Sequence, residues 1–519
     1  MADDPVRRVV IVGGGTAGWL TAGIIAADHR AAHEDGVRVT LVESPTVPIL
    51  GVGEGTWPSL RDTLRRIGVS ETAFIRRCNA SFKQGSRFDG WKTGAADDFY
   101  YHPFEAPPDA DAVDVLALWR AAPPGTPFGE AVSCQAGLCL EGRAPKQAVT
   151  PEYAAVANYA YHLDAPAFAA LLQEHCMDNL GVRHVRDDVV GALRDDAGGV
   201  AAVATREAGA VEGDLFIDCT GSKAVLLGET LGIRTKSASD VLFNDRALAV
   251  QAPYAGDAEP IASQTTGTAL GAGWVWDIAL QTRRGVGYVF SSRHRGEAEA
   301  RSELSAYLRR AAPHSGVSGE DARLIRFQSA YRETPWTENA VAVGMAQGFV
   351  EPLEASAIVM IELSATMISD TLPPRRGMMA GAARRFNERF SYRWGRIVDF
   401  LKLHYILSQR PEAYWADHRD KATWPDRLAR LVEQWRYEPP SREDFAETLE
   451  IFPAASYAYV LYGMGFATES RMTRRRKDAP ENAALHVGDV SSKLKKFLGG
   501  LPTNRELLSH IRSRGLSRI

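Results

Sequence analysis

The first forty residues alternate between apolar and polar segments in a way that predicts three elements. The run "RRVVIV" at residues 7–12 is typical of a buried strand, and it leads through glycines into an apolar pattern with helical spacing that ends near residue 30. The segment "VRVTLVES" at residues 37–44 is a second apolar strand. This order predicts a β-α-β unit at the start of an α/β fold.

The turn between the first strand and the helix carries a phosphate-binding pattern. Gly13, Gly15 and Gly18 have the spacing GxGxxG, which lets the backbone approach a pyrophosphate at the amino terminus of the helix. Glu43 ends the second strand, where a carboxylate can bind the ribose of an adenine dinucleotide. The strand, the helix and the acidic residue together predict a dinucleotide site.

Two later segments return to the same pattern of strand followed by glycine turn. They are "GDLFIDCTGS" at residues 213–222 and "NAVAVGMAQGF" at residues 339–349, with a long helical pattern from about residue 355. We expect these remote segments to complete the first β-α-β unit, with the substrate region inserted between them. Flavoproteins are commonly assembled in this way, so the pattern favours FAD over NAD.

The predicted fold is α/β, with a Rossmann-like FAD-binding domain of the flavin monooxygenase type, an inserted substrate-facing β-sheet and a helical carboxyl-terminal region. We expect the first part of the FAD domain over residues 1–227, the sheet over 228–330, the return of the FAD domain over 331–380 and the helical region over 381–519.

Composition narrows the class of protein. The chain of 519 residues is 45% hydrophobic and 24% charged, as in ordinary globular proteins, and its net charge of -4 argues against a nucleic-acid surface. No apolar run reaches the roughly 20 residues of a membrane span, and the start reads as a strand rather than a signal peptide. Five cysteines without CxxC spacing predict free thiols and no metal site. We expect a cytoplasmic protein without a membrane partner.

Several ordered motifs carry a family resemblance. They are "GGGTAGW" at 13–19, "GVGEGTWPSL" at 51–60, "FK" at 82–83, "GWVWDI" at 273–278 and "GFVEPLEASAI" at 348–358. Over most of its length the chain resembles the flavin-dependent halogenases, often called tryptophan halogenases. Trp274 and Trp276 are diagnostic: two tryptophans at this spacing on a strand usually fill a core, whereas in this family the pair separates a flavin chamber from a substrate chamber.

The resemblance implies a reaction in two chambers. A separate flavin reductase would supply reduced FAD, which with O2 and chloride or bromide would give hypohalous acid. This oxidant would pass through a tunnel to Lys83 and halogenate an electron-rich aromatic compound such as an indole. The single nucleotide fingerprint is consistent with a separate reductase. The family also implies a homodimer.

The resemblance also assigns roles to residues. Lys83 would be catalytic, either as a hydrogen-bond donor to hypohalous acid or as a haloamine. Glu354, ranked above its neighbour Glu351, would orient the oxidant and accept the proton that the ring loses. The backbone amides of Ser356 and Ala357 would bind halide. The expected cofactor contacts are Gly13, Gly15, Thr16, Ala17, Gly18, Glu43, Gly53, Glu54, Val189, Met345 and Ile358.

Three departures from the tryptophan-specific enzymes bear on the substrate. Residues 355–357 read Ala-Ser-Ala where those enzymes carry Ser-Thr-Gly, and Ala279 replaces their proline after the paired tryptophans. Their carboxyl-terminal cluster that holds tryptophan has no clear counterpart. The motif "EPLEAS" is typical of a less characterised bacterial branch, so we expect an indole-like or other electron-rich aromatic substrate rather than free tryptophan.

Two other functions stay open at this point. A flavin-dependent aromatic hydroxylase would transfer oxygen directly to its substrate, and a non-catalytic flavin-binding protein would keep only the fold. His162 and His404 could be mistaken for catalytic residues, but no second ligand lies near either in sequence. We expect both histidines to be packed or hydrogen-bonded.

Overall fold

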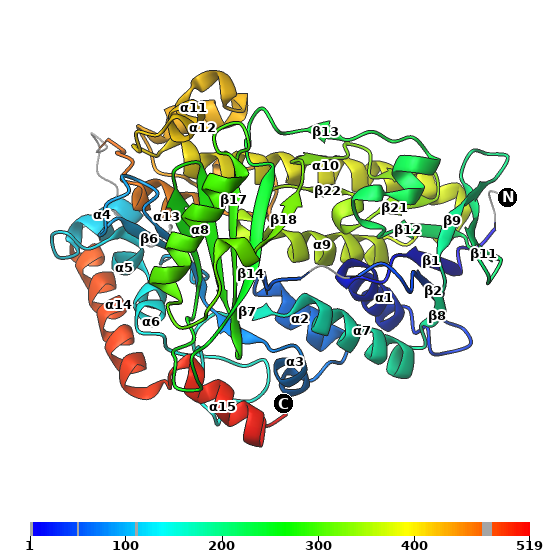
Figure 1. Cartoon of the computed structure of the whole chain (residues 1–519), viewed down its shortest axis with the longest axis horizontal. Coiled ribbons are helices and arrows are strands. Elements are labelled where there is room, and N and C mark those ends of the chain that lie inside the picture. Colours follow the sequence, from blue (N-terminus) through cyan, green and yellow to red (C-terminus); the bar gives the residue numbers. More distant parts are fainter. Residues whose placement is uncertain (1–3, 49–50, 109–112, 470–479, 519) are drawn as a thin grey trace. The chain divides into compact units, whose positions relative to one another are not determined.

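A computed structural model describes residues 4–48, 51–108, 113–469 and 480–518 (Figure 1). The chain forms two compact units. The first unit comprises residues 1–79, 163–238 and 328–394, and the second unit comprises residues 80–162, 239–327 and 395–519. Each unit is therefore assembled from three separate stretches of sequence.

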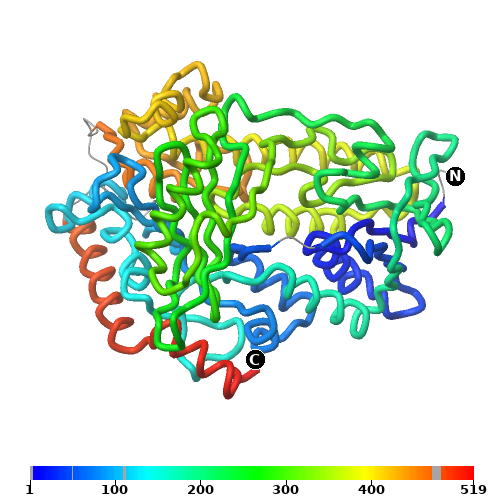
Figure 2. Tube along the Cα trace, in the orientation of Figure 1, coloured from blue at the N-terminus to red at the C-terminus, as the bar shows by residue number. Residues whose placement is uncertain are grey.

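The first unit is built on a sheet of six strands in the order β20-β21-β12-β1-β2-β8. Its central strands are parallel, with Val10 opposite both Thr40 and Phe216. Figure 2 shows blue, green and yellow-green segments side by side in this unit. The prediction that remote segments complete the first β-α-β unit is confirmed. The strands are β1 (Arg8–Val12), β2 (Arg38–Glu43), β8 (Arg183–Arg186), β12 (Leu215–Asp218), β20 (Trp336–Thr337) and β21 (Ala340–Ala342).

Apolar strands explain why this sheet is buried. Val10, Val12, Val42 and Phe216 share a core with Ala340, as near-continuous apolar strands of a parallel sheet require. The helices of the unit are α1 (Thr16–Asp28), α2 (Ser59–Arg66), α3 (Glu71–Arg77), α7 (Ala165–Leu180) and α9 (Ser356–Asp370). Its smaller strands are β3 (Glu54–Gly55), β9 (Val189–Arg194), β10 (Val200–Thr205), β11 (Ala210–Glu212), β13 (Lys236–Ser237), β19 (Ala330–Tyr331) and β22 (Gly348–Phe349).

The second unit contains a sheet of seven strands in the order β18-β14-β17-β16-β15-β5-β6. Helix α8 (Glu297–Ala311) packs on one face of it, where Val275 meets Leu304. The strands are β5 (Gly85–Asp89), β6 (Phe99–Pro103), β14 (Arg246–Pro253), β15 (Thr265–Leu270), β16 (Gly273–Ala279), β17 (Arg283–Phe290) and β18 (Arg323–Arg326). Strands β4 (Ser81–Lys83) and β7 (Ala160–Leu163) form a separate antiparallel pair.

Helices dominate the end of the chain. The long α10 (Met379–Ile406) begins in the first unit and ends in the second. It is followed by α11 (Ala413–Arg419), α12 (Asp426–Trp435), α13 (Ala454–Gly463), α14 (Pro480–Gly500) and α15 (Asn504–Arg514), and α4 (Val115–Ala121), α5 (Phe128–Val132) and α6 (Cys134–Leu140) precede β7. The predicted fold class, an α/β protein with a helical carboxyl-terminal region, is confirmed.

The unit boundaries differ from those expected from sequence. Residues 80–162, which carry Lys83, belong with the seven-stranded sheet rather than with the glycine loop. The physical reason is strand pairing: β5, two residues after Lys83, pairs in parallel with β15 from position 265 onward. Such long-range pairing leaves no local signal in the sequence.

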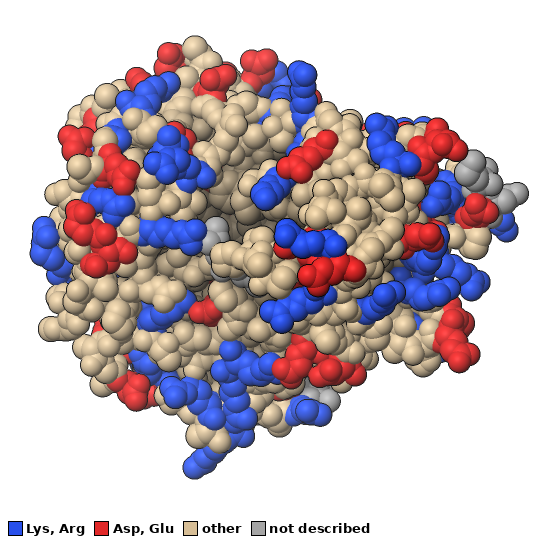
Figure 3. Space-filling view, turned by 45° about the vertical axis from the view of Figure 1, so that its right-hand side comes forward, with Lys and Arg blue, Asp and Glu red and all other residues tan. Residues whose placement is uncertain are grey.

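The surface gives few further clues. On the face drawn in Figure 3, basic and acidic side chains are interspersed. Within the described ranges, no helix is long and apolar enough to cross a membrane. All five cysteines are free and buried.

Candidate active site

The glycine loop joins β1 to α1 and leaves the start of the helix open. Gly13 has φ +110°, and a Cβ there would lie 2.3 Å from the carbonyl oxygen of Cys219. A Cβ at Gly15, in contrast, would meet no atom within 4 Å. Gly15 caps α1 without a side-chain hydrogen bond, so the first-turn amides point toward open space. This geometry suits a bound pyrophosphate.

Glu43 lies against this loop at the end of β2. A Cβ at Gly14 would stand 2.1 Å from the carboxyl carbon of Glu43, so only glycine allows this approach. One carboxylate oxygen of Glu43 lies 3.1 Å from Nε2 of His184 on β8. The carboxylate is thus held where the carboxyl ends of parallel strands meet, as expected of a ribose ligand.

The turn after β21 lies at the same edge of the six-stranded sheet as the glycine loop. Gly344, in the turn Gly344–Ala346 after β21, has φ +69°, and a Cβ there would lie 2.8 Å from the Cβ of Ala17. Its neighbour Met345 is 50% exposed. The structure therefore brings together the predicted cofactor residues Thr16, Ala17, Gly18 and Met345 with the rest of the glycine loop and Glu43.

Four other predicted cofactor residues also lie in the first unit. Gly53 precedes β3, and burial raises the pKa of the adjacent Glu54 to about 7. Ile358 is buried on α9. Val189 begins β9 and packs against the core that contains Val200, which is the ordinary role of a strand valine.

The backbone is strained where α9 begins. Glu354 has φ 65° and ψ 7°, and Ala355 has φ 54° and ψ 46°. Two consecutive residues with side chains in the left-handed region cost on the order of 1–3 kcal/mol each, and such strain clusters at functional sites. The indole N–H of Trp57 donates a 2.8 Å hydrogen bond to the carbonyl oxygen of Glu354.

The turn presents an uncapped helix start. Ala355 is the N-cap of α9 and offers no side-chain hydrogen bond, and no acidic residue occupies the first turn. Among the described residues, no acidic side chain of this first turn lies at the positive end of the α9 dipole. Glu351 and Glu354 are both buried before the helix, with Glu354 9% exposed.

Lys83 is buried at the end of β4 in the second unit. Its side chain is 1% exposed, and Nζ lies 5.4 Å from the centre of the Phe104 ring. Full burial of a lysine is uncommon, although Lys146 and Lys402 of the same unit are equally buried. Strand alternation puts Ser81 on the same face of β4.

His162 lies beside Lys83 and is fully buried. Its Nδ1 lies 3.4 Å from the Ser81 hydroxyl and its Nε2 lies 2.8 Å from the Thr265 hydroxyl. Burial, together with the charge of Lys83, lowers the pKa of His162 well below its ordinary value. The expectation of a hydrogen-bonded histidine is confirmed, and His404 likewise meets the Tyr100 hydroxyl at 2.6 Å.

Trp274 and Trp276 share one face of β16, opposite the face that Val275 presents to α8. Their ring centres are 6.4 Å apart. Trp276 lies directly across from Gly287 on β17, where a Cβ would stand 2.0 Å from its indole. On the other side Trp276 pairs with Gly267. The bare glycines on both neighbouring strands leave room for the large ring.

An aromatic cluster extends this face, and sequence reasoning missed it. Trp91 lies 6.1 Å from Trp274, and it also contacts Tyr405 and Trp415. Its indole N–H donates to the carbonyl oxygen of Gly267. These aromatics come from stretches more than 300 residues apart in sequence, which only the folded chain brings together.

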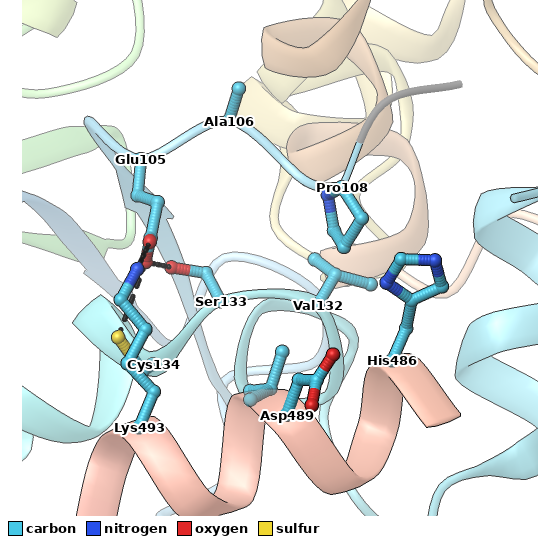
Figure 4. Close-up of a pocket in the computed structure, with 10 residues that line it drawn as sticks. Glu105, Ala106, Pro108, Val132, Ser133, Cys134, His486, Asp489 and Lys493 are labelled. Carbon is cyan, nitrogen blue, oxygen red and sulfur yellow. Dashed lines mark hydrogen bonds and ion pairs between the residues drawn. The ribbon is translucent and has the colours of Figure 1, made fainter. Parts of the chain in front are cut away.

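A separate cavity in the second unit contains no predicted site residue (Figure 4). Glu105, Ser133 and Cys134 line it on one side, and His486 and Lys493 line it from α14. Burial opposes ionisation of Glu105, but hydrogen bonds from Lys493 and Ser133 outweigh it and hold the pKa of Glu105 below its ordinary value. Glu105 is therefore paired with Lys493 and bonded to Ser133, which indicates a structural role rather than a catalytic one.

Comparison with known proteins agrees with this fold. The tryptophan halogenase family model matches residues 8–479. The chain is similar to the tryptophan 6-halogenase SttH of Streptomyces toxytricini, with 34% identity over 88% of this chain and 89% of that protein. It is also similar to a crystal structure of a tryptophan halogenase from Shewanella frigidimarina, with a TM-score of 0.96 and 44% identity over 100% of both chains.

A third similar protein is described more generally as a flavin-dependent halogenase. BrvH, a flavin-dependent halogenase from Brevundimonas sp. BAL3, has a TM-score of 0.84 and 30% identity, covering 97% of this chain and 99% of its own. The fold and these relatives define a flavin-dependent halogenase, an enzyme class that uses reduced flavin, O2 and halide. The chain belongs to the tryptophan halogenase family, as its motifs predicted.

Proposed function

We propose that this enzyme uses FADH2, O2 and chloride or bromide to make hypohalous acid, which reaches Lys83 through a tunnel and halogenates an electron-rich, indole-type aromatic compound. The observation that carries the proposal is the strained pair Glu354 and Ala355 at the uncapped start of α9. Strain of this kind is kept where a site needs it. A separate flavin reductase would supply the FADH2.

The residues of the first unit fit an FAD molecule. The open space beyond Gly15 and the first-turn amides of α1 would hold the pyrophosphate, and Glu43 would accept hydrogen bonds from the adenosine ribose. When bound, the reduced flavin supplies the electrons that activate O2 for halide oxidation.

The start of α9 would hold the halide. The amides of Ser356 and Ala357 are directed by the left-handed turn and carry the positive end of the helix dipole. Backbone amides bind an anion whatever the side chains are, so the change from Ser-Thr-Gly to Ala-Ser-Ala leaves such a site intact.

Lys83 would activate the oxidant. A buried ammonium is a strong hydrogen-bond donor, and the neutral His162 beside it adds no second positive charge. In the transfer step, the carbon–halogen bond forms as the oxygen–halogen bond of hypohalous acid breaks. The oxygen leaves as hydroxide, which takes a proton from the ammonium of Lys83 to give water, and the proton that the ring carbon loses passes to the carboxylate of Glu354.

Trp274 and Trp276 would keep the substrate chamber apart from the flavin. Their large rings occupy one face of β16, and the bare Gly287 lets Trp276 lie flat against the sheet. A partition of this kind favours halogenation over direct oxygen transfer, because a hydroxylase must let its substrate touch the flavin.

The test is mass spectrometry of reactions that contain FAD, a flavin reductase, NADH and bromide. The panel of aromatics should include indole, indole derivatives and free tryptophan, since the relatives SttH and RebH are named as tryptophan halogenases. We expect the isotopic doublet of a monobrominated indole-type product. A hydroxylated product that forms without halide would establish the hydroxylase instead.

A further inference from the structure

Helix α9 carries a buried carboxylate that the proposed chemistry does not use. Glu362 is 3% exposed, and its side chain accepts hydrogen bonds from the hydroxyls of Ser59 at 3.0 Å and Thr63 at 2.5 Å. Ser59 and Thr63 are four residues apart on α2, so both hydroxyls lie on one face of that helix. Glu362 therefore ties α9 to α2 with both of its oxygens.

A second tie joins the same two segments. Trp57 lies two residues before α2, and its indole N–H donates to the carbonyl oxygen of Glu354, two residues before α9. The segment that begins at Trp57 thus holds α9 at its entry turn and again two turns along the helix. Two anchors at different heights fix both the rotation and the axial position of a helix.

Burial of this carboxylate needs an explanation. Desolvation penalises a charged group in the interior by several kcal/mol, and a well-packed apolar residue is often at least as stabilising. Burial raises the pKa of Glu362 to about 7, because the two hydroxyl donors only partly offset that penalty. The neighbouring α9 residues Ile361 and Ala365 are apolar, so packing alone would favour an apolar residue here.

The turn at Glu354 and Ala355 needs such an anchor. Residues in the left-handed region persist only where the surrounding structure over-determines them. The direction of the Ser356 and Ala357 amides follows from this turn, and an anion site made of amides is sensitive to their direction. A small rotation of α9 about its axis would turn them away from a bound halide.

We propose that Glu362 is a positioning residue of the halide site: held by Ser59 and Thr63, it fixes α9 against α2 and keeps the amides of Ser356 and Ala357 aimed at the halide. This inference rests on the proposed function, because it presumes that the start of α9 binds halide.

The test compares Glu362→Gln and Thr63→Val with the control Ser364→Ala. Ser364 is equally buried on α9, but its hydroxyl donates to the carbonyl oxygen of Met360 and not to α2. We expect the first two variants to raise the bromide KM about five- to tenfold, with kcat at saturating bromide within about twofold of the parent protein. The control should keep the parent bromide KM.

A direct binding measurement accompanies the kinetics. Bromide should raise the thermal midpoint of the flavin-free protein above that in sodium acetate of equal ionic strength, because a ligand of the native state stabilises it. Glu362→Gln should lose this increment and Ser364→Ala should keep it. The inference would be wrong if Glu362→Gln kept both the bromide-dependent rise in thermal midpoint and the bromide KM of the parent protein. It would also be wrong if the variant had a lower kcat with an unchanged bromide KM.

These results separate the two proposals. If the parent protein binds bromide and Glu362→Gln does not, but no brominated product forms, then the positioning role stands and the halogenase chemistry fails. If the parent protein brominates and Glu362→Gln has the same bromide KM, then only the positioning role fails. If the parent protein neither binds bromide nor halogenates, both proposals are wrong.

Discussion

The indole N–H of Trp57 donates to the carbonyl oxygen of Glu354, the first of two consecutive residues with a left-handed backbone. This hydrogen bond joins residues 297 positions apart, and it ends on the turn that precedes the proposed halide site. It therefore links the motif "GVGEGTWPSL" to the motif "EPLEAS", which sequence alone presents as separate features.

Loss of that hydrogen bond should reduce halogenation activity more than it reduces the stability of the fold. We expect Trp57→Phe to lower the free energy of unfolding by about 1 kcal/mol and to reduce the halogenation rate several-fold. Denaturant unfolding and product formation measure the two effects. Trp336→Phe is a matched control, because the Trp336 indole also donates to the carbonyl oxygen of a left-handed glutamate, Glu338, at 3.1 Å. Equal activity losses in both variants would contradict a specific role for Trp57.

Glycine at position 355 should relieve strain at a cost to halide binding. Ala355 has φ 54°, which glycine adopts without penalty, so Ala355→Gly should raise the free energy of unfolding by about 1 kcal/mol. The freed turn should at the same time raise the bromide KM. A thermal midpoint below that of the parent protein would show that the turn is not strained.

Two substitutions in the glycine loop should have different effects, one on FAD affinity and the other on the stability of the flavin-free protein. Gly15 has φ −75° and open space around it, so Gly15→Ala should leave the stability of the flavin-free protein unchanged while weakening FAD binding at least tenfold. Gly13→Ala should destabilise the flavin-free protein, because its Cβ would meet the backbone of Cys219. Flavin fluorescence titration and thermal unfolding distinguish the two, and unchanged FAD affinity in Gly15→Ala would place the cofactor elsewhere.

Stability should depend on pH through Glu362. Its pKa is raised to about 7 in the folded protein, against about 4.5 in the unfolded chain. The folded state therefore holds this proton more tightly, so the contribution is complete below about pH 4.5 and is lost as pH rises through 7. Asp399 has a similarly raised pKa and acts in the same direction.

The substitution Glu362→Gln removes the pH-dependent contribution of this side chain to the free energy of unfolding. The unfolding free energy of the variant should fall less between pH 5 and pH 8 than that of the parent protein, by on the order of 3 kcal/mol at most. Urea unfolding at a series of pH values provides the measurement. Parallel pH profiles for the two proteins would mean that Glu362 stays ionised throughout.

Local patterns allowed the fold to be predicted, since strand, glycine turn and helix follow one another within thirty residues at the amino end. The paired tryptophans were correctly placed on one face of a strand because alternation has a period of two. The family resemblance identified Lys83 and Glu354 as candidate catalytic residues. A lysine or a glutamate in a sequence does not by itself indicate a catalytic role. No signal in composition or periodicity would have singled them out.

Features that depend on long-range contacts were not predicted. Left-handed backbone at Glu354 is invisible in sequence, because residues with side chains usually avoid it. The assignment of Lys83 to the second unit follows from strand pairing with residues far along the chain. Two signals were available, however: Glu362 interrupts the apolar run "AIVMIELSATMIS", and Gly267 and Gly287 interrupt two strands beside Trp276.

The most direct measurement of the central claim is the fate of the oxidant in Lys83→Met. Reactions with bromide, FAD and a reductase would be assayed for brominated indole and, with an added chemical trap, for free hypobromous acid. We expect Lys83→Met to release trappable hypobromous acid but to give no brominated indole. The control Lys402→Met, which changes an equally buried lysine of the same unit, should still brominate. Brominated indole from Lys83→Met at the parent rate would contradict the role of Lys83.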